Sequence, residues 1–308
     1  MTDVAIVIVT WNSGEYIKDC LDSLFSNTSH KIDFEVVIVD NNSQDKTLQV
    51  LNNYERDIEI IKNGRNLGFS IANNQGLYSK EAENYVILNP DTEAKEGWLK
   101  ELLKESKKDD VGIVGGKLLY SDGEIQHAGA RVGKKGPEHI KQNWTNEPRE
   151  VEYVTGACAL ISREVIEEIG YLDEMFSPAY FEETDLCFRA RYSGFRIIYN
   201  PDCNVIHYEG KSTDNKPSSF VYFINRKNHL KFTALNLSGK DLFYNLVWDA
   251  KHLVASIIGY KYNPISQLVE AYREFLMDFP NILAKRYNRE EFVPSYYCED
   301  VRDYGSRY

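Results

Sequence analysis

The hydrophobic positions of residues 1–115 form short continuous runs, each followed by a polar turn and then by apolar residues at helical spacing. The runs at 3–10 ("DVAIVIVT") and 34–40 ("FEVVIVD") are rich in β-branched residues and do not alternate with polar ones. Such runs are typical of strands buried on both faces of a parallel sheet. With further strands expected in "IEIIKN" and "NYVILNP", the alternation predicts an α/β fold with a mostly parallel, doubly wound sheet flanked by helices. Ser13 and Ser43 are the expected N-caps of the first two helices.

The pattern changes after residue 115. Residues 111–133 suggest strands and hairpins, and residues 155–174 suggest a strand followed by a helix. In "FRIIYNPDCNVIHYEG" we expect two strands around a Pro-Asp turn, and in 133–150, which lacks periodicity, a mobile loop. From about residue 226 the spacing is helical, which divides the chain into 1–225 and a helical C-terminal extension, 226–308.

The helical extension carries an apolar stripe. Such a stripe is usually core or a dimer interface, and less often a lipid-binding face. The final stretch, 290–308, has no clear periodicity and is either an ordered arm or a frayed end. The stripe consists of Leu242, Leu246, Leu253, Val254 and Ile257.

Composition excludes several functional classes. The 308 residues carry a net charge of -11, which disfavours a nucleic acid partner. The five cysteines never occur in a CxxC spacing, which argues against a disulfide framework and a structural zinc site. No apolar run approaches the roughly 20 residues of a membrane span, and the start of the chain lacks the charge pattern of a signal peptide. We therefore expect a cytoplasmic protein.

Polar and turn-forming residues follow four of the predicted strands. In an open parallel sheet, ligands bind beyond the carboxyl ends of the strands, so these residues would share one edge. Turn chemistry alone also favours Asn, Asp and Gly at such positions. The residues are Thr10, Trp11 and Asn12; Asp40, Asn41 and Asn42; residues 63–68; and Asn89, Pro90 and Asp91.

These residue types suit a nucleotide. Asp40 could accept a hydrogen bond from the imide of uracil or thymine, and Thr10 and Asn12 could bind the nucleoside. The two commonest phosphate-binding motifs, GxGxxG after the first strand and GxxxxGK[ST], are absent. A diphosphate would therefore need a divalent cation, with Asp91 as the leading carboxylate ligand and Asn89 orienting a phosphate or a metal-bound water.

Three acids crowd the start of a predicted helix in "YFEETDLCFRARYSG", 180–194. Carboxylates there can simply stabilise the helix dipole, with Thr184 or Asp185 as a cap. Alternatively, one of these carboxylates takes part directly in a catalysed reaction.

Taken together, seven segments resemble family 2 glycosyltransferases, most closely the rhamnosyltransferase-like branch of bacteria and archaea. They occur in the order and spacing of that family and cover roughly residues 3–235. The segments are "IVTWN", "VVIVDNNSQDKT", "NLGFSIANNQG", "VILNPDT", "TGACALISREVIEEIGYLDEMF", "YFEETDLCFRARYSG" and "YNPDCNVIHYEGKS".

The resemblance implies a GT-A fold, with a nucleotide-binding half at 1–115 and an acceptor-binding, catalytic half at 116–225. It further implies a nucleotide-diphosphate-sugar donor (dTDP- or UDP-linked), a divalent metal (Mg²⁺ or Mn²⁺) and inversion at the anomeric carbon. The acceptor would be a hydroxyl group of a glycan or a lipid-linked saccharide. The resemblance is also compatible with peripheral contact with the inner face of the membrane, or with a homodimer through the C-terminal helices.

The matching positions assign roles. Glu183 is the expected general base, Glu182 holds a hydroxyl group, and Asp185 caps the helix or supports the site, with the helix dipole keeping these carboxylates ionised. Asp91 and His207 are the expected metal ligands. Two positions depart from the family: Asn89 replaces the first acid of the DxD motif, and Glu182-Glu183 replaces Glu-Asp. The expected donor contacts are Thr10, Asn12, Asp40, Asn42, Arg65, Asn66, Gly68, Asn74, Asn89 and Asp91, the weaker acceptor candidates are His127 and Trp11, and Arg226 could reach the diphosphate.

Two alternatives remain. A nucleotidyltransferase normally needs a basic glycine-rich loop, and a sugar-modifying enzyme needs a dinucleotide fingerprint; the chain has neither. The second alternative is a catalytically inactive GT-A module that binds a nucleotide sugar or a glycan partner. Only an activity measurement distinguishes it from an enzyme.

Overall fold

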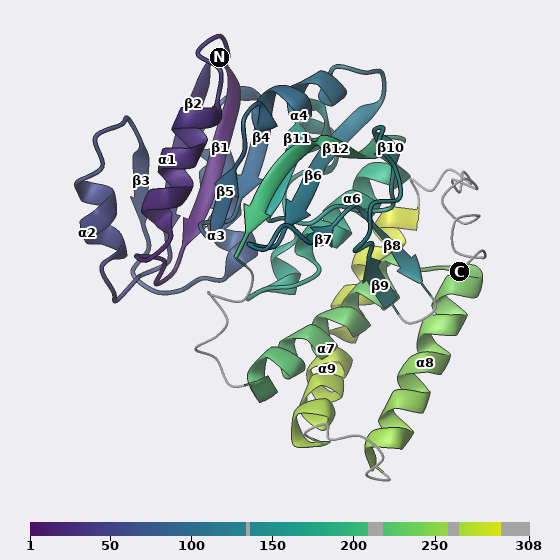
Figure 1. The fold of residues 1–308 in the computed structure, drawn as a ribbon. Helices are drawn as coiled ribbons and strands as arrows, with labels where there is room; N and C mark the ends of the chain where they lie inside the picture. The colour runs from purple at the N-terminus through teal and green to yellow at the C-terminus, as the bar shows by residue number, and fades with distance from the viewer. Residues whose placement is uncertain (134–135, 209–217, 258–264, 291–308) are drawn as a thin grey trace.

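The computed structural model describes residues 1–133, 136–208, 218–257 and 265–290 (Figure 1). A mixed sheet and its helices form the larger part, and three helices lie together below it. The strands are β1 (Thr2–Thr10), β2 (Phe34–Asp40), β3 (Glu59–Lys62), β4 (Ala82–Leu88), β5 (Thr92–Ala94), β6 (Val111–Leu119), β7 (Ile125–His127), β8 (Ala130–Gly133), β9 (Gly136–His139), β10 (Arg149–Glu150), β11 (Cys158–Ser162) and β12 (Arg196–His207). The helices are α1 (Ile17–Asn27), α2 (Thr47–Asn52), α3 (Phe69–Tyr78), α4 (Trp98–Ser106), α5 (Arg163–Ile169), a 3₁₀ turn η1 (Glu174–Phe176), α6 (Glu182–Tyr192), α7 (Ser218–Asn236), α8 (Gly239–Ile257) and α9 (Ile265–Glu290).

The main sheet has the strand order β10-β12-β6-β11-β4-β1-β2-β3. Strands β1, β2, β3 and β4 are parallel to one another, and β12 is parallel to β6. Between them β11 is antiparallel to both β4 and β6, so β6 and β12 run in the same direction as β4. The carboxyl ends of β1, β2, β4 and β12 therefore lie along the same edge, as the strand-end argument requires.

Both faces of the sheet are buried, which confirms the interpretation of the continuous apolar runs. Alternate residues of β1, such as Ile6 and Ile8, pack with α1 and α4 on one face. Val7, in contrast, packs with α3, α5 and α6 on the other. A separate apolar cluster, which includes Phe188 of α6, Phe232 of α7 and Ile282 of α9, joins the C-terminal helices to the sheet-containing part.

Several local predictions need correction. The two strands expected around Pro201 are one strand, β12, with register shifts that include one between Asn200 and Asn204. The segment 133–150, expected to be a mobile loop, contains β9 and β10. Helices α1 and α2 start later than expected, with Tyr16 and Lys46 as their N-caps. The hydroxyl group of Ser13 accepts from the N–H of Trp11 in its own loop, and that of Ser43 accepts from the N–H of Asn12 in the neighbouring loop.

The boundary proposed at 225/226 falls inside α7, so the division into two domains stays a prediction. The expected arm at 290–308, Cys298 and the end of the last family segment (209–212) lie largely outside the described residues. The same holds for the side chain of Ile257 in the apolar stripe.

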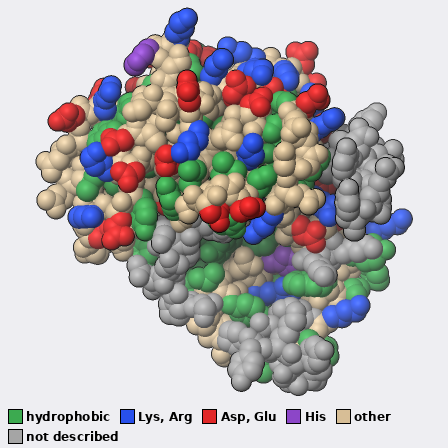
Figure 2. Space-filling view, in the orientation of Figure 1, with side chains coloured by type: hydrophobic (Ala, Val, Ile, Leu, Met, Phe, Trp, Pro, Cys, Tyr) green, Lys and Arg blue, Asp and Glu red, His purple; other side chains and the backbone are tan. Residues whose placement is uncertain are grey.

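The outer surface differs between the two parts. Charged side chains of both signs are spread over the sheet-containing part (Figure 2). Helices α8 and α9 instead expose large apolar side chains. Among the described residues, no helix combines the length and hydrophobicity that crossing a membrane requires. The apolar side chains include Phe243, Leu246, Val254, Val269, Leu276, Met277 and Leu283.

Candidate active site

Asp40 joins the ends of β1 and β2. Its Oδ1 accepts hydrogen bonds from the hydroxyl groups of Thr10 (3.0 Å) and Ser43 (2.5 Å), and its Oδ2 accepts one from the backbone N–H of Ser43 (3.0 Å). The side chain is only 1% exposed. A carboxylate has about four acceptor sites, so roughly one remains for a base. Asp40 is thus a structural link in its own right, and its contact with a base stays a prediction.

Asn12 and Asn42 adopt left-handed backbone conformations, with φ of 53° and 64°. Asn tolerates this region better than most residues, so turn geometry explains the residue type. Both side chains accept hydrogen bonds from Gln44, Asn12 from its backbone N–H (2.8 Å) and Asn42 from its amide (3.1 Å). The loops after β1 and β2 are therefore held together at the edge where a nucleotide would bind.

The loop before α3 contacts the segment that leads into α6. Gly68 has φ of +87°, and a Cβ there would lie 2.8 Å from the Cα of Pro178, so only glycine fits. The next N–H, that of Phe69, donates to the carbonyl oxygen of Pro178 (2.7 Å). Asn66 accepts from the N–H of Gly68 (2.9 Å), while Arg65 is exposed.

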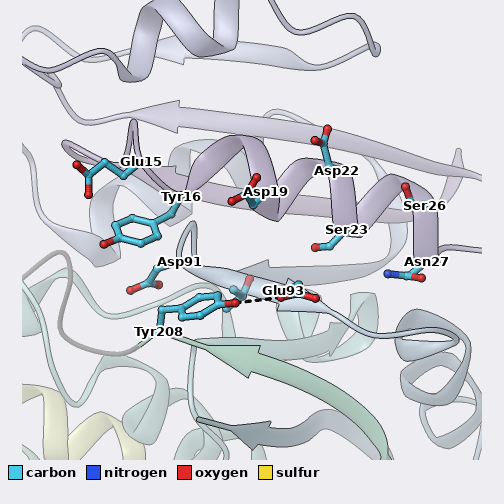
Figure 3. Close-up of a pocket in the computed structure, with 11 residues that line it drawn as sticks. Glu15, Tyr16, Asp19, Asp22, Ser23, Ser26, Asn27, Asp91, Glu93 and Tyr208 are labelled. Atoms are coloured by element: carbon cyan, nitrogen blue, oxygen red, sulfur yellow. Dashed lines mark hydrogen bonds between the residues drawn. The ribbon is translucent and has the colours of Figure 1, made fainter. Parts of the chain in front are cut away.

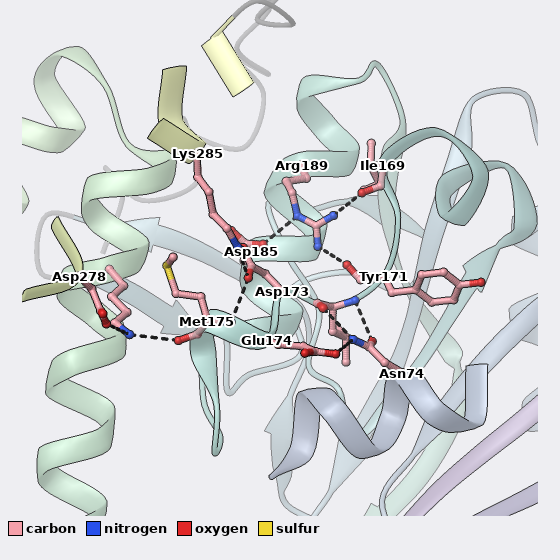
Figure 4. Close-up of polar contacts among 12 residues, drawn as sticks. Asn74, Ile169, Tyr171, Asp173, Glu174, Met175, Asp185, Arg189, Asp278 and Lys285 are labelled. Atoms are coloured by element: carbon pink, nitrogen blue, oxygen red, sulfur yellow. Dashed lines mark hydrogen bonds and ion pairs between the residues drawn. The ribbon is translucent and has the colours of Figure 1, made fainter. Parts of the chain in front are cut away.

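Asn74 lies apart from the other expected donor contacts. Its amide donates to the carbonyl oxygen of Leu172 (3.0 Å) and to Glu174 (3.2 Å), and its oxygen accepts from the N–H of Leu172 (3.1 Å). These bonds hold the segment before η1 against α3 (Figure 4). Because the buried amide is used within the protein, we leave Asn74 out of the proposal below.

Asp91, Asn89 and His207 form one cluster. Nε2 of His207 lies 3.3 Å from Oδ1 of Asp91 and 3.2 Å from the amide nitrogen of Asn89. On the other side of the ring, Nδ1 of His207 lies 2.7 Å from Oε1 of Gln126, whose amide donates to the carbonyl oxygen of His207 (3.2 Å). Since Oε1 of Gln126 can only accept, Nδ1 carries a proton, and since the amide nitrogen of Asn89 can only donate, Nε2 presents a lone pair beside Asp91.

A groove of about 590 Å³ runs from this cluster along α1 (Figure 3). Asp91 lies at one end, between Tyr16 and Tyr208, whose rings stack with centroids 6.4 Å apart. Five carboxylates line the groove, and a diphosphate beside them would be repelled unless a cation offset their charge. They are Glu15, Asp19, Asp22, Asp91 and Glu93.

The start of α6 differs from the expectation in two ways. Phe181 is the N-cap, with φ of 78° and no side-chain cap, so neither Thr184 nor Asp185 caps the helix. For Glu182 and Glu183, the dipole also does not keep the carboxylates at their usual pKa. Burial raises the pKa of Glu183 to about 7 in spite of bonds from backbone N–H groups, and burial together with the charge of Glu183 raises the pKa of Glu182 well above its usual range.

Asp185 supports the helix from inside. Its carboxylate, fully buried, accepts from Nε of Arg189 (2.8 Å) and from the amide of Asn236 at the end of α7 (2.9 Å). Arg189 donates in turn to the carbonyl oxygens of Ile169 and Tyr171 (Figure 4). Of the two roles expected for Asp185, support of the site is the one compatible with this geometry.

Glu183 lines a second cavity, of about 220 Å³, between the sheet-containing part and the C-terminal helices. The cavity is separate from the groove at Asp91, but the two are linked through the backbone. A Cβ on Gly156 would lie 3.6 Å from Cβ of Glu183, and the next carbonyl, of Ala157, accepts from the N–H of Asn89 (3.0 Å). The other lining residues are Pro137, His139, Tyr153, Tyr180, Phe181, Thr184, Asn225, Arg226, His229 and Trp248.

The weaker acceptor candidates lie outside that cavity lining. His127 is buried, and its Nδ1 lies 3.0 Å from Nδ1 of His139, which does line the cavity. Burial, and after it His139 and His207, lowers the pKa of His127 well below its usual range, so the ring is neutral. Trp11 is half-buried in the loop after β1.

Comparison with known proteins decides the family. The pattern described as glycosyl transferase family 2 matches residues 5–170, more than half of the chain. The chain therefore belongs to glycosyl transferase family 2.

Several curated proteins are similar over most of this chain. An uncharacterized protein, y4gI, of Sinorhizobium fredii is 28% identical over 74% of this chain. A low-salt glycan biosynthesis hexosyltransferase of Haloferax volcanii is 29% identical over 77% of this chain and 76% of its own length. An N-acetylglucosaminyl-diphospho-decaprenol L-rhamnosyltransferase of Mycobacterium tuberculosis is 28% identical over 72% of this chain and 81% of its own length. The chain spans only 27% of the length of y4gI and 17% of the length of the O-antigen biosynthesis protein RfbC of Myxococcus xanthus, to which it is 29% identical.

Solved structures confirm the GT-A fold. GalNAc-T7 with UDP, GalNAc and Mn²⁺ matches with a TM-score of 0.66 at 16% identity, covering 96% of this chain and 58% of that one. Staphylococcus aureus TarS in complex with UDP-GlcNAc matches with a TM-score of 0.64 at 18% identity, covering 92% and 83%.

Two contributors to this family 2 site were missed from sequence. Gln126 precedes His127, which drew attention because of its imidazole, yet Gln126 is the residue that orients His207. Asn228 on α7 donates to the carbonyl oxygens of Phe176, Ala179 and Tyr180, just before the acids of α6. An isolated Gln or Asn has no sequence signature for such contacts, and the sequence indicated only that the chain is helical from about residue 226.

Proposed function

We propose that the protein is an inverting glycosyltransferase that moves a sugar from a nucleotide-diphosphate donor to a hydroxyl group of a glycan or lipid-linked acceptor. The observation that carries the proposal is Glu183. Its carboxylate opens into a cavity, has a pKa near neutrality, and lies a short stretch of backbone from the cluster of Asn89, Asp91 and His207.

In this reaction Glu183 takes the proton from the acceptor hydroxyl group while the diphosphate leaves from the opposite side of the sugar. A base with a pKa near the working pH is ionised often enough to act and basic enough to accept the proton. Glu182, whose pKa burial and the charge of Glu183 raise well above its usual range, would hold a sugar hydroxyl group by a hydrogen bond.

The cluster at Asp91 fits a divalent metal, Mg²⁺ or Mn²⁺. Oδ1 of Asp91 is buried without a hydrogen-bond partner, and Nε2 of His207 presents a lone pair beside it. No group of three or more His, Cys, Asp or Glu side chains in the described ranges could hold a metal, so two protein ligands and the donor diphosphate would share the ion. Once bound, such an ion would stabilise the charge of the departing diphosphate.

The donor is proposed to be a dTDP- or UDP-sugar, held by the loops that contain Thr10, Asn12, Asp40, Asn42 and residues 65–68. Rhamnose is the candidate sugar because the Mycobacterium tuberculosis relative is named an L-rhamnosyltransferase. A panel of nucleotide sugars tests this: we expect slow, metal-dependent hydrolysis of one of them, and none by Glu183→Gln.

A catalytically inactive module is the second candidate, because Asn89 replaces the first acid of the usual metal-binding motif. It predicts that the wild-type protein binds a nucleotide sugar, measured by calorimetry, without hydrolysing or transferring any of the panel.

The exposed apolar side chains of α8 and α9 are the proposed contact for either a homodimer or the inner face of the membrane, with the protein in the cytoplasm. Sedimentation equilibrium detects the first. Co-sedimentation with lipid vesicles at physiological salt detects the second, and a monomer that stays in the supernatant would refute both.

A further inference from the structure

Helices α7 and α8 close the cavity that contains Glu183. Arg226 and His229 on α7 and Trp248 on α8 line it opposite Tyr153 and the start of α6. Figure 2 shows a hollow between the sheet-containing part and the helices, with a histidine side chain visible in it. At about 220 Å³ the cavity is smaller than the roughly 300–1,000 Å³ of a typical drug-sized site, so it suits one small ring.

Three polar side chains in the lining are more than nine-tenths buried and incompletely paired. Tyr153 is 1% exposed, and its hydroxyl group has no hydrogen-bond partner. Arg226 is 5% exposed, and its Nε is unpaired; His229 is 4% exposed, and neither ring nitrogen makes a hydrogen bond. Buried polar groups are nearly always hydrogen-bonded, so such a concentration around one cavity calls for a ligand.

The charges of the lining favour a neutral ligand. Nη2 of Arg226 donates to Asp249, which already offsets the guanidinium charge, and Asp249 also lies 3.5 Å from Nδ1 of His229. Glu183 adds a carboxylate on the other side. An anionic ligand would therefore meet no uncompensated positive charge except a protonated histidine.

The walls favour a ring with apolar faces. Trp248 lies beneath the guanidinium group of Arg226, with 5.0 Å from Cζ to the ring centroid. The imidazole of His229 makes edge contacts with Phe181 and Trp248, at centroid distances of 5.8 and 5.7 Å. A sugar ring presents C–H groups on its faces and hydroxyl groups at its rim, which matches aromatic walls with polar atoms between them.

We propose that this cavity is the subsite for the acceptor's terminal sugar, a neutral monosaccharide ring, and that Tyr153, Arg226, His229 and Trp248 bind it. The C-terminal helices thus form part of the substrate site. The proposal rests on the proposed function, which supplies the role of Glu183, but binding can be measured without turnover.

The test uses saturation-transfer NMR of the full chain with methyl glycosides of glucose, galactose, mannose, N-acetylglucosamine and rhamnose, and with inorganic phosphate. We expect at least one glycoside, but not phosphate, to bind the wild-type protein. Trp248→Ala should abolish the signal, while Phe243→Ala, a change on the same helix at a side chain 62% exposed, should leave it unchanged.

Tyr153→Phe is the sharper variant because it removes only the unpaired hydroxyl group. If the hydroxyl group of Tyr153 does not contact the sugar, the variant should fold and bind the glycoside as the wild type does. The proposal instead predicts an unchanged melting temperature with roughly five- to tenfold weaker glycoside binding, the value of one hydrogen bond. This variant also decides the matter if Trp248→Ala fails to fold.

No glycoside binding, phosphate binding alone, or unaltered affinity in Tyr153→Phe would overturn the subsite. The nucleotide-sugar hydrolysis assay separates failure of the subsite proposal from failure of the proposed function. Donor hydrolysis that depends on Glu183, without glycoside binding, would support the proposed function and reject the subsite. Glycoside binding that weakens in Tyr153→Phe, without hydrolysis of any donor, would support the subsite and reject the proposed function.

Discussion

Glu183→Gln is expected to remove the base and to change the pH dependence of the reaction. The substitution keeps the size of the side chain but cannot accept a proton. Loss of a positioned general base typically costs about 10²- to 10⁴-fold in rate. Nucleotide affinity should stay within several-fold, because Glu183 lines the second cavity and not the groove at Asp91.

The magnitude of the pH effect follows from the burial of Glu183. The base must be deprotonated to act, and burial raises its pKa from 4.5 to about 7. Activity should therefore be lost as the pH falls through 7. Between about pH 5 and about pH 8 the ionised fraction, and with it kcat/KM, should rise about 90-fold, whereas an unshifted carboxylate would give less than about a twofold rise.

The assay is donor turnover across this pH range for the wild type, Glu183→Gln and Glu168→Gln. Glu168 is exposed on α5, so its substitution controls for the loss of one carboxylate. A wild-type profile that is flat above about pH 6 would refute the argument from burial. Unchanged turnover in Glu183→Gln would refute the assignment of the base itself.

Three further predictions concern groups around the site. Asp91→Ala should lose metal-dependent donor binding, which calorimetry with and without Mn²⁺ measures; equal donor affinity in both conditions for the wild type would contradict a metal there. Gln126→Leu frees the ring of His207, so Mn²⁺ affinity measured by the same method should fall about 10- to 100-fold, and no change would show that the orientation of His207 is unimportant. Asn228→Ala leaves three carbonyl groups without their donor, so the free energy of unfolding should fall by about 1–3 kcal/mol and kcat should fall with it; a loss of stability with an unaltered kcat and pH profile would make Asn228 purely structural.

The sheet could be predicted because its signal is local. A strand buried on both faces needs apolar residues at every position, and the runs that form β1 and β2 satisfy this without reference to the rest of the chain. The strand-end rule then placed Asp40 and Asp91 on one edge, whereas His207 came from the family resemblance; its ring lies 3.3 Å from Asp91.

What sequence could not provide was the effect of burial. From the chain alone, three acids at a helix start are expected to be ionised by the dipole, yet the packing around Glu182 and Glu183 outweighs it. Similarly, Asp185 carries the same charge as its neighbours, but an arginine one turn away in its own helix pairs with it and makes it structural. Which acid of three faces a cavity depends on contacts distant in sequence.

The segment before α6 explains why the C-terminal helices matter for chemistry. Tyr180 and Phe181 both have left-handed backbones, with φ of 75° and 78°, a conformation that costs on the order of 1–3 kcal/mol per residue other than glycine. Such a turn persists only if its surroundings hold it. Here the restraints come from both sides, from the N–H of Phe69 on the donor side and from the amide of Asn228 on α7.

Further contacts of the same kind extend along this segment. Lys285 of α9 pairs with Asp173, and Lys231 of α7 donates to the carbonyl oxygen of Met175 (3.2 Å) while pairing with Asp278 of α9 (Figure 4). The segment that leads to Glu183 is thus held by the loop before α3 and by helices α7 and α9. A helical extension that only covered the surface would have no reason to direct the buried amide of Asn228 at the strained turn that precedes the proposed base.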